Sequence, residues 1–153
     1  MYVGPVRIFY TMCTFGRLPV FTTTPTVAAV RDQLLINAAS CDVDILAYCF
    51  MPDHLHYLAE GLTEAADLRN FTRRFRQRSG YQYRQQHRSR LWQEGYFDRH
   101  LREEDATYDV VSYIVANPIR AGLSRSLAEY PHVGATRYGL EELTDYVRWK
   151  PLG

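Results

Sequence analysis

The sequence predicts an α+β fold in which helices pack on a mainly antiparallel sheet. Residues 43–62 form an apolar segment with a period of two and a bend at Pro52, which is typical of interior strands. Segments with helical periodicity alternate with such strands in the order β-β-α-β-α-β-α-α. The 153 residues, 46% of them hydrophobic and 23% charged, have the size and composition of one globular domain that covers residues 1–153.

Two strands and a helix are expected before residue 41. Residues 6–21 have mixed strand character and carry a turn signal at Gly16. Thr24 and Pro25 are typical of a helix start, because a hydroxyl can cap the first turn and proline fits the first helical position. Apolar side chains at helical spacing continue this helix to about residue 40: Val27, Val30, Leu34 and Leu35.

The remaining elements follow the apolar segment. A helix is expected to begin near Thr63, with acidic residues in its first turn, and to be interrupted at Gly80. Residues 91–101 predict a strand, and residues 103–105 are expected to open another helix. Residues 139–149 predict a final amphipathic helix.

Two histidines follow the bend at Pro52. Residues two apart in a strand point to the same face, so His54 and His56 present two imidazoles side by side. Two neutral imidazoles can chelate a divalent cation or act on one phosphate. The pattern also fits one core histidine beside one surface histidine, so it leaves both interpretations open.

Tyr113 and Asn117 form a second polar pair. They are four residues apart in a predicted helix and share a face directed away from the apolar stripe of that helix. Pro118 is expected to end or kink the helix directly after them. Most of the 12 tyrosines are expected to pack a ring and bond through the hydroxyl, so spacing alone does not mark Tyr113 as a nucleophile.

An unmixed run of arginines predicts a polyanionic partner. The net charge is only +1, but residues 69–90 contain eight arginines and no Asp or Glu. Arginine makes bidentate contacts with phosphate and stacks on bases, so a nucleic-acid surface is expected here. Tyr81 either offers a stacking platform for bases or covers an edge of the core. The candidate residues are Arg69, Arg73, Arg74, Arg76, Arg78, Tyr81 and Arg84.

Together these motifs resemble the REP-associated tyrosine transposases, relatives of the single-tyrosine transposases of the HUH class (His, hydrophobic residue, His). The resemblance rests on Met-Pro-Asp-His-Leu-His at residues 51–56 and on Tyr-Ile-Val-Ala-Asn-Pro-Ile-Arg-Ala-Gly-Leu at residues 113–123. It also includes Trp-Gln-Glu-Gly-Tyr-Phe-Asp at residues 92–98 and extends from about Arg7 to Pro131. It implies the ferredoxin-like catalytic domain of that class.

The resemblance implies a metal-dependent endonuclease and strand transferase that acts on single-stranded DNA folded as palindromic REP hairpins. It implies Tyr113 as the nucleophile of a 5′-phosphotyrosine intermediate, with His54 and His56 as its catalytic partners. It implies that His54, His56 and Asn117 hold one divalent cation, Mg²⁺ or Mn²⁺, where better-known relatives use glutamine in place of Asn117. It further implies a monomer, although other relatives are dimers that share tyrosines between subunits.

Two other functions fit parts of the sequence. A nucleotide hydrolase of the histidine-triad kind would need a third histidine at the position of Leu58. A metal hydrolase that forms no covalent intermediate is a separate possibility, in which Glu60 would act beside the histidine pair. A non-catalytic domain that binds single-stranded or hairpin nucleic acid would also carry the arginine run.

The remaining sequence features predict a cytoplasmic protein of the bacterial cytosol or nucleoid. Cys13, Cys41 and Cys49 form no C-x-x-C pair, which predicts reduced thiols. The first residues do not have the pattern of a signal peptide. No apolar run approaches the roughly 18–20 residues of a membrane span, so no membrane partner is expected.

Overall fold

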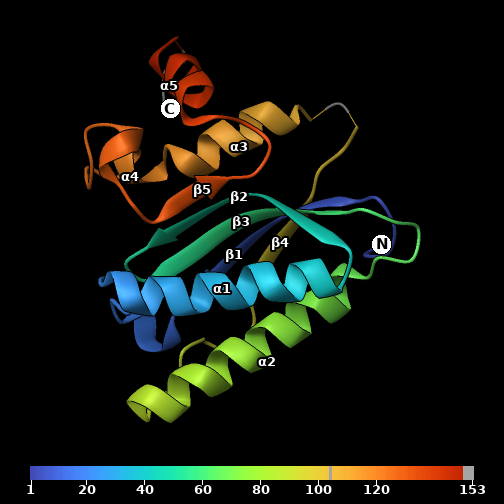
Figure 1. Cartoon of the computed structure of the whole chain (residues 1–153), viewed down its shortest axis with the longest axis vertical. Coiled ribbons are helices and arrows are strands. Elements are labelled where there is room, and N and C mark those ends of the chain that lie inside the picture. Colours follow the sequence, from blue (N-terminus) through green and yellow to red (C-terminus); the bar gives the residue numbers. More distant parts are fainter. Residues whose placement is uncertain (104, 150–153) are drawn as a thin grey trace.

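A five-stranded sheet lies between two layers of helices (Figure 1). The computed structural model describes residues 1–103 and 105–149. The sheet has the order β4-β1-β3-β2-β5, and every neighbouring pair is antiparallel. The strands are β1 (Arg7–Cys13), β2 (Val43–Met51), β3 (His54–Gly61), β4 (Phe97–His100) and β5 (Val133–Ala135). The predicted α+β class is therefore confirmed.

The chain follows a ferredoxin-like path up to β4. It runs β1, α1 (Thr24–Ser40), β2, β3, α2 (Leu68–His87) and β4, which gives the strand order β4-β1-β3-β2. After β4 come α3 (Thr107–Val115), α4 (Asn117–Arg120) and, beyond β5, α5 (Leu140–Trp149). Short 3-10 turns lie at Phe15–Arg17 and Leu127–Glu129. In the part of the chain that the structure describes, no helix has the length and apolar character to cross a membrane.

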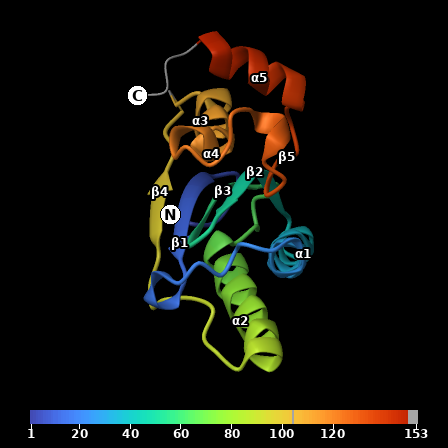
Figure 2. The same cartoon turned by 90° about the vertical axis from the view of Figure 1, so that its left-hand side faces the viewer.

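The two faces of the sheet build two separate cores. The side view shows α1 and α2 on one side and α3, α4 and α5 on the other (Figure 2). Alternate residues of a strand point to opposite faces, so β3 sends Leu55 and Tyr57 into the core with α1 and α2. Leu58 belongs to the other core, with α3 and α5. His54 and His56 share the pleat of Leu58 and therefore face the α3 layer.

A turn lies at the bend predicted at Pro52, but it joins two strands, β2 and β3, where the predicted order counted one strand over residues 43–62. Met51 pairs with His54, so Pro52 and Asp53 form the two-residue connection of an antiparallel hairpin. Thr14 donates two hydrogen bonds to the Asp53 carbonyl, from its amide at 3.0 Å and its hydroxyl at 3.1 Å. The Phe21 amide donates to the Pro52 carbonyl at 2.9 Å. The turn is thus held by backbone contacts from the segment after β1.

Three helix predictions are wrong. α2 begins at Leu68 instead of near Thr63, and the Asp67 carboxylate caps it by accepting from the amides of Arg69 and Asn70 at 3.0 and 3.1 Å. α2 also continues through Gly80 to His87, since one glycine costs only about 1 kcal/mol and tertiary packing outweighs it. α3 begins at Thr107, later than the start predicted over residues 103–105, of which residue 104 lies outside the described residues. Before the helix, the Asp105 carboxylate accepts from the Arg102 amide.

The strand predictions also need correction. The strand expected over residues 91–101 reduces to β4, because Gly95 adopts a left-handed φ of 78° and Arg76 binds the carbonyls of Gln93 and Gly95. Residues 18–21 do not form a second strand. β5 was not predicted, since three residues are too few to show a period of two. The predicted free thiols are present at Cys13, Cys41 and Cys49.

Candidate active site and nucleic-acid interface

His54 and His56 lie side by side on β3, with ring centroids 4.7 Å apart. His54 Nδ1 is 2.7 Å from Asp53 Oδ1, and His56 Nδ1 is 2.9 Å from Thr11 Oγ1. An ionised carboxylate only accepts, so the His54 proton belongs on Nδ1 and its Nε2 keeps a lone pair. Thr11 permits the same tautomer on His56 when its hydroxyl accepts. The pair can therefore offer two Nε2 atoms on one face of the sheet.

Asp53 is fixed by contacts on both carboxylate oxygens. Arg17 Nε donates to Oδ2 at 3.0 Å, opposite the His54 bond to Oδ1. Although partial burial opposes the shift, the hydrogen bonds from His54 and Arg17 lower the pKa of Asp53. Arg17 adopts a left-handed φ of 55°, a conformation that costs energy in a residue other than glycine. The turn after β1 thus accepts backbone strain while it holds a carboxylate against His54.

His56 is neutral at physiological pH. Burial, together with the charges of His54 and Arg120, lowers its pKa to about 4. The neutral form is the one that can bind a cation through a ring nitrogen.

Tyr113 lies on α3 over the same face of the sheet, with half of its surface exposed. Its ring centroid is 6.3 Å from that of Phe9, and Phe9 is 5.5 Å from His56. Arg120 lies over the Tyr113 ring at 3.8 Å, and its Nη1 donates to the Tyr113 carbonyl at 2.7 Å. A fixed positive charge therefore contacts the tyrosine from the side of α4.

Asn117 is the first residue of α4 and is half-buried. The helix break predicted at Pro118 comes two residues earlier, because α3 ends at Val115 and α4, which contains Pro118, starts after Ala116. The prediction that Asn117 shares one helix with Tyr113 is therefore wrong. In residues 1–103 and 105–149, no group of three His, Cys, Asp or Glu side chains could hold a metal. A site at the histidine pair would need a third protein donor of another kind. A carboxamide oxygen such as that of Asn117 is a donor of this other kind.

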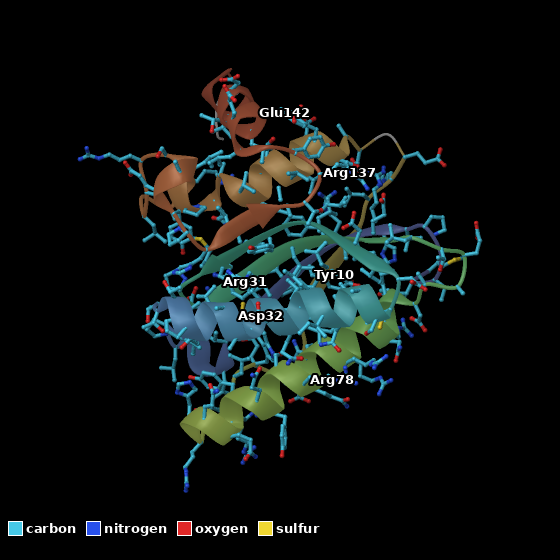
Figure 3. All side chains as sticks on the ribbon, viewed as in Figure 1. Tyr10, Arg31, Asp32, Arg78, Arg137 and Glu142 are labelled. Carbon is cyan, nitrogen blue, oxygen red and sulfur yellow. The ribbon has the colours of Figure 1, made fainter. Side chains whose placement is uncertain are left out.

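Four of the predicted arginines hold α2 against its neighbours. Arg76 is the most firmly fixed, since it donates to two carbonyls at 2.8 and 3.2 Å. Arg78 lies on α2, where Figure 3 labels it, and its Nη1 donates to Asn37 Oδ1 of α1 at 2.8 Å. The contacts join Arg69 to the Tyr2 ring, Arg74 to the Cys41 sulfur, Arg76 to the Gln93 and Gly95 carbonyls, and Arg78 to the Asn37 side chain.

The outer surface of α2 is cationic and open. Arg73, Tyr81 and Arg84 are exposed, and Tyr81 shows 69% of its surface. Tyr81 therefore does not cover an edge of the core. A pocket of about 380 Å³ lies beside it, and its lining includes Arg76, Arg84, Arg90 and Trp92. Cations around an exposed ring are the usual elements of a nucleic-acid surface.

Comparison with known proteins decides the family. The model of the family described as transposase IS200 like matches residues 6–117, which is most of the chain and includes the histidine pair, Tyr113 and Asn117. The chain belongs to this family. The resemblance inferred from the sequence motifs is thereby confirmed, and this IS200-like transposase has a role of the transposase type.

Two solved structures share the fold of the transposase. A REP-associated tyrosine transposase bound to a REP hairpin matches with a TM-score of 0.73 at 17% identity, over 87% of this chain and 78% of that chain. A protein from Deinococcus radiodurans R1 described as a transposase matches with a TM-score of 0.56 at 18% identity, over 76% and 92%. At such identities the likeness establishes the fold alone. No curated protein matches the sequence.

Several residues of the site were not predicted from the sequence. Phe9 and Thr11 lie on β1, opposite Leu58 and His56 of β3, so their place depends on strand pairing between distant segments. Alternation along β1 would have placed both on one face, but it does not reveal which strand lies beside them. Arg17 lies in a 3-10 turn and Arg120 lies in the short helix α4. Both elements are too short to give a periodic pattern in the sequence.

Proposed function

We propose that this IS200-like transposase cleaves and rejoins single-stranded hairpin DNA through a covalent bond to Tyr113. The observation that carries the proposal is the pair of β3 imidazoles, each engaged through Nδ1, beneath a helix that carries an exposed tyrosine. His54, His56 and Asn117 would hold one divalent cation, Mg²⁺ or Mn²⁺. When bound, that cation would neutralise charge on the non-bridging oxygens of the phosphate.

The reaction exchanges one phosphate ester for another. The Tyr113 hydroxyl loses its proton and attacks phosphorus in line, and the bond from phosphorus to the 3′ oxygen breaks. The 5′ phosphate stays on Tyr113, and the departing 3′ oxygen gains a proton to become a free hydroxyl. A second 3′ hydroxyl then attacks the phosphotyrosine and releases Tyr113. Each step makes and breaks one P–O bond, so no nucleotide cofactor is needed.

Arg120 supports this role of Tyr113. A guanidinium 3.8 Å from the ring centroid places positive charge beside the tyrosine on which negative charge would develop during the attack. The same cation would attract the phosphate that Tyr113 attacks.

The hairpin substrate is supported by the relative whose structure contains a REP hairpin. We infer that the outer surface of α2 binds the phosphates of the hairpin, with Arg73 and Arg84 as the cations and Tyr81 as a stacking residue. We also infer that a monomer suffices, since Tyr113 and the histidine pair of one chain share one face of the sheet.

An adduct assay tests the proposal. The protein is incubated with Mn²⁺ and a labelled hairpin oligonucleotide with single-stranded flanks, and a covalent protein–DNA adduct should survive a denaturing gel. Tyr113→Phe should abolish the adduct and keep hairpin binding. Tyr108→Phe is the matched control, because Tyr108 lies on the same helix and its hydroxyl donates to the Glu142 carbonyl at 2.8 Å. An adduct that persists in Tyr113→Phe refutes the role of Tyr113. Hairpin binding by the unaltered protein without any adduct would leave a non-catalytic binding domain.

A further inference from the structure

Phe97 has the most exposed phenylalanine or tyrosine ring among the described side chains, at 71% of its surface. It lies on β4, one of the two edge strands of the sheet. Single exposed apolar residues are common, but edge strands usually carry charged residues that prevent pairing with other chains. The position of Phe97 on the sheet indicates a reason for this exposure.

Phe97 belongs to a row of residues that ends at the histidine pair. It pairs with Thr11 across β4 and β1, and Thr11 pairs with His56 across β1 and β3. Residues directly opposite in an antiparallel pair point to the same face, so all three face the α3 layer. The hydrogen bond between Thr11 and His56 confirms this for two of them. With neighbouring strands roughly 4.8 Å apart, the Phe97 backbone lies about 10 Å from that of His56.

A hollow next to this row carries further aromatic and charged groups. Arg99 and Phe9 pair one step along the same face, and a pocket of about 380 Å³ lies between them and α3. Its lining consists of Phe9, Arg99, Asp109, Val110 and Tyr113. The open side of the sheet next to Tyr113 thus combines aromatic rings with an arginine whose side chain is 60% exposed.

This combination fits an unpaired nucleotide. A flat ring that lies open to solvent can stack on a nucleobase, and a neighbouring arginine can bind its phosphate. The bases of a hairpin stem are already stacked on one another, so they have no free face to offer. The matching ligand is therefore a base in the single-stranded flank of the hairpin.

We propose that Phe97 is the stacking platform for an unpaired base within one or two nucleotides of the cleaved phosphate. The inference rests on the proposed function, because it takes the histidine pair as the position of that phosphate. Every base has a π-face, so the platform fixes the path of the strand and does not select one base.

Binding of oligonucleotides with single abasic positions tests the platform. The Tyr113→Phe protein is used without metal, so that affinity is measured in the absence of cleavage. Adding Phe97→Ala should weaken binding of the flanked hairpin about 5- to 100-fold, which corresponds to the stacking of one base. Phe97→Trp should restore affinity. When Phe97 is present, removing the base at one position of the flank should weaken binding by the same factor as Phe97→Ala does. In the Phe97→Ala variant, removing that base should weaken binding no further.

Two controls separate the platform from general effects. Leu62→Ala removes a side chain of similar exposure, 59%, beyond the opposite end of β3, and should leave affinity unchanged. A hairpin without flanks should bind equally well to the Phe97→Ala variant and to its parent. The inference is overturned when Phe97→Ala binds the flanked hairpin as tightly as its parent. It is also overturned when the loss of affinity caused by Phe97→Ala is the same whichever position of the oligonucleotide is abasic. If Phe97→Ala and one abasic position cause the same, non-additive loss of affinity but the unaltered protein forms no adduct, only the proposed cleavage is refuted. If an adduct forms but the two losses of affinity are independent, only the stacking platform is refuted.

Discussion

Replacing Asp53 with asparagine should weaken the binding of a divalent cation at the histidine pair. The Asp53 carboxylate only accepts, and at 2.7 Å it keeps the His54 proton on Nδ1. An asparagine amide can turn its NH₂ group to Nδ1, which moves the proton to Nε2 and removes the lone pair that a cation needs. Changes to residues that orient a metal-binding histidine typically cost about 10- to 100-fold in affinity, or roughly 1.4 to 2.8 kcal/mol.

The fold should tolerate this change. The hairpin turn is held through its backbone, because Thr14 and Phe21 donate to the Asp53 and Pro52 carbonyls. These bonds do not involve the substituted side chain. The melting temperature of the metal-free variant should therefore stay close to that of the unaltered protein. This separates an effect on metal affinity from a loss of structure.

The assay is calorimetric titration with Mn²⁺ at neutral pH, together with a thermal melt without metal. Glu60→Gln is the matched control, because it makes the same carboxylate-to-amide change on β3, where the partner is Arg137 at 2.8 Å. The control should bind Mn²⁺ like the unaltered protein. The reasoning is wrong when Asp53→Asn keeps full affinity, or when Glu60→Gln loses as much. The second result would instead support the hydrolase function considered for Glu60.

Three further predictions concern charge. The His56 pKa of about 4 in the folded protein lies below the roughly 6.5 of an unfolded histidine, so the free energy of unfolding should fall by up to about 3 kcal/mol as the pH drops from 6.5 towards 4. Urea unfolding at several pH values measures this, and His56→Gln should remove that part of the dependence. Arg73→Ala and Arg84→Ala should each weaken hairpin binding and lower the slope of log Kd against log salt by about 0.7 to 0.9 in anisotropy titrations; an unchanged slope removes that residue from the interface. Arg120→Gln should slow single-turnover adduct formation by Tyr113 about 10- to 100-fold with little change in hairpin affinity, and an unchanged rate would show that this guanidinium has no part in the reaction.

The histidine pair was predictable because its geometry is local. A period of two and a turn at Pro52 place His54 and His56 on one face of a strand, whatever lies beside it. The position of Tyr113 over the face of the sheet that carries the histidine pair was not predictable in this way, because it depends on which face α3 covers. Only the family resemblance carried that long-range information into the interpretation of the sequence.

The start of α2 shows why a local signal can mislead. Thr63 and Asp67 are both good helix caps, and nothing nearby in the sequence chooses between them. The choice is made by the N-terminal segment, where the Gly4 amide donates to the Ala66 carbonyl and the Leu68 amide donates to the Tyr2 carbonyl. These bonds hold residues 63–67 outside the helix. The contacts span more than 60 positions, so no sequence window around Thr63 contains them.

The double contact between Arg120 and Tyr113 has a consequence for motion. Arg120 binds both the ring and the backbone carbonyl of Tyr113, and the two residues flank the corner at Ala116 where α3 meets α4. If this corner pivots over the sheet, the proposed nucleophile Tyr113 and the guanidinium that contacts it would move as one rigid body. The distance to the imidazoles would change while the electrostatic partner of the phenol stayed the same.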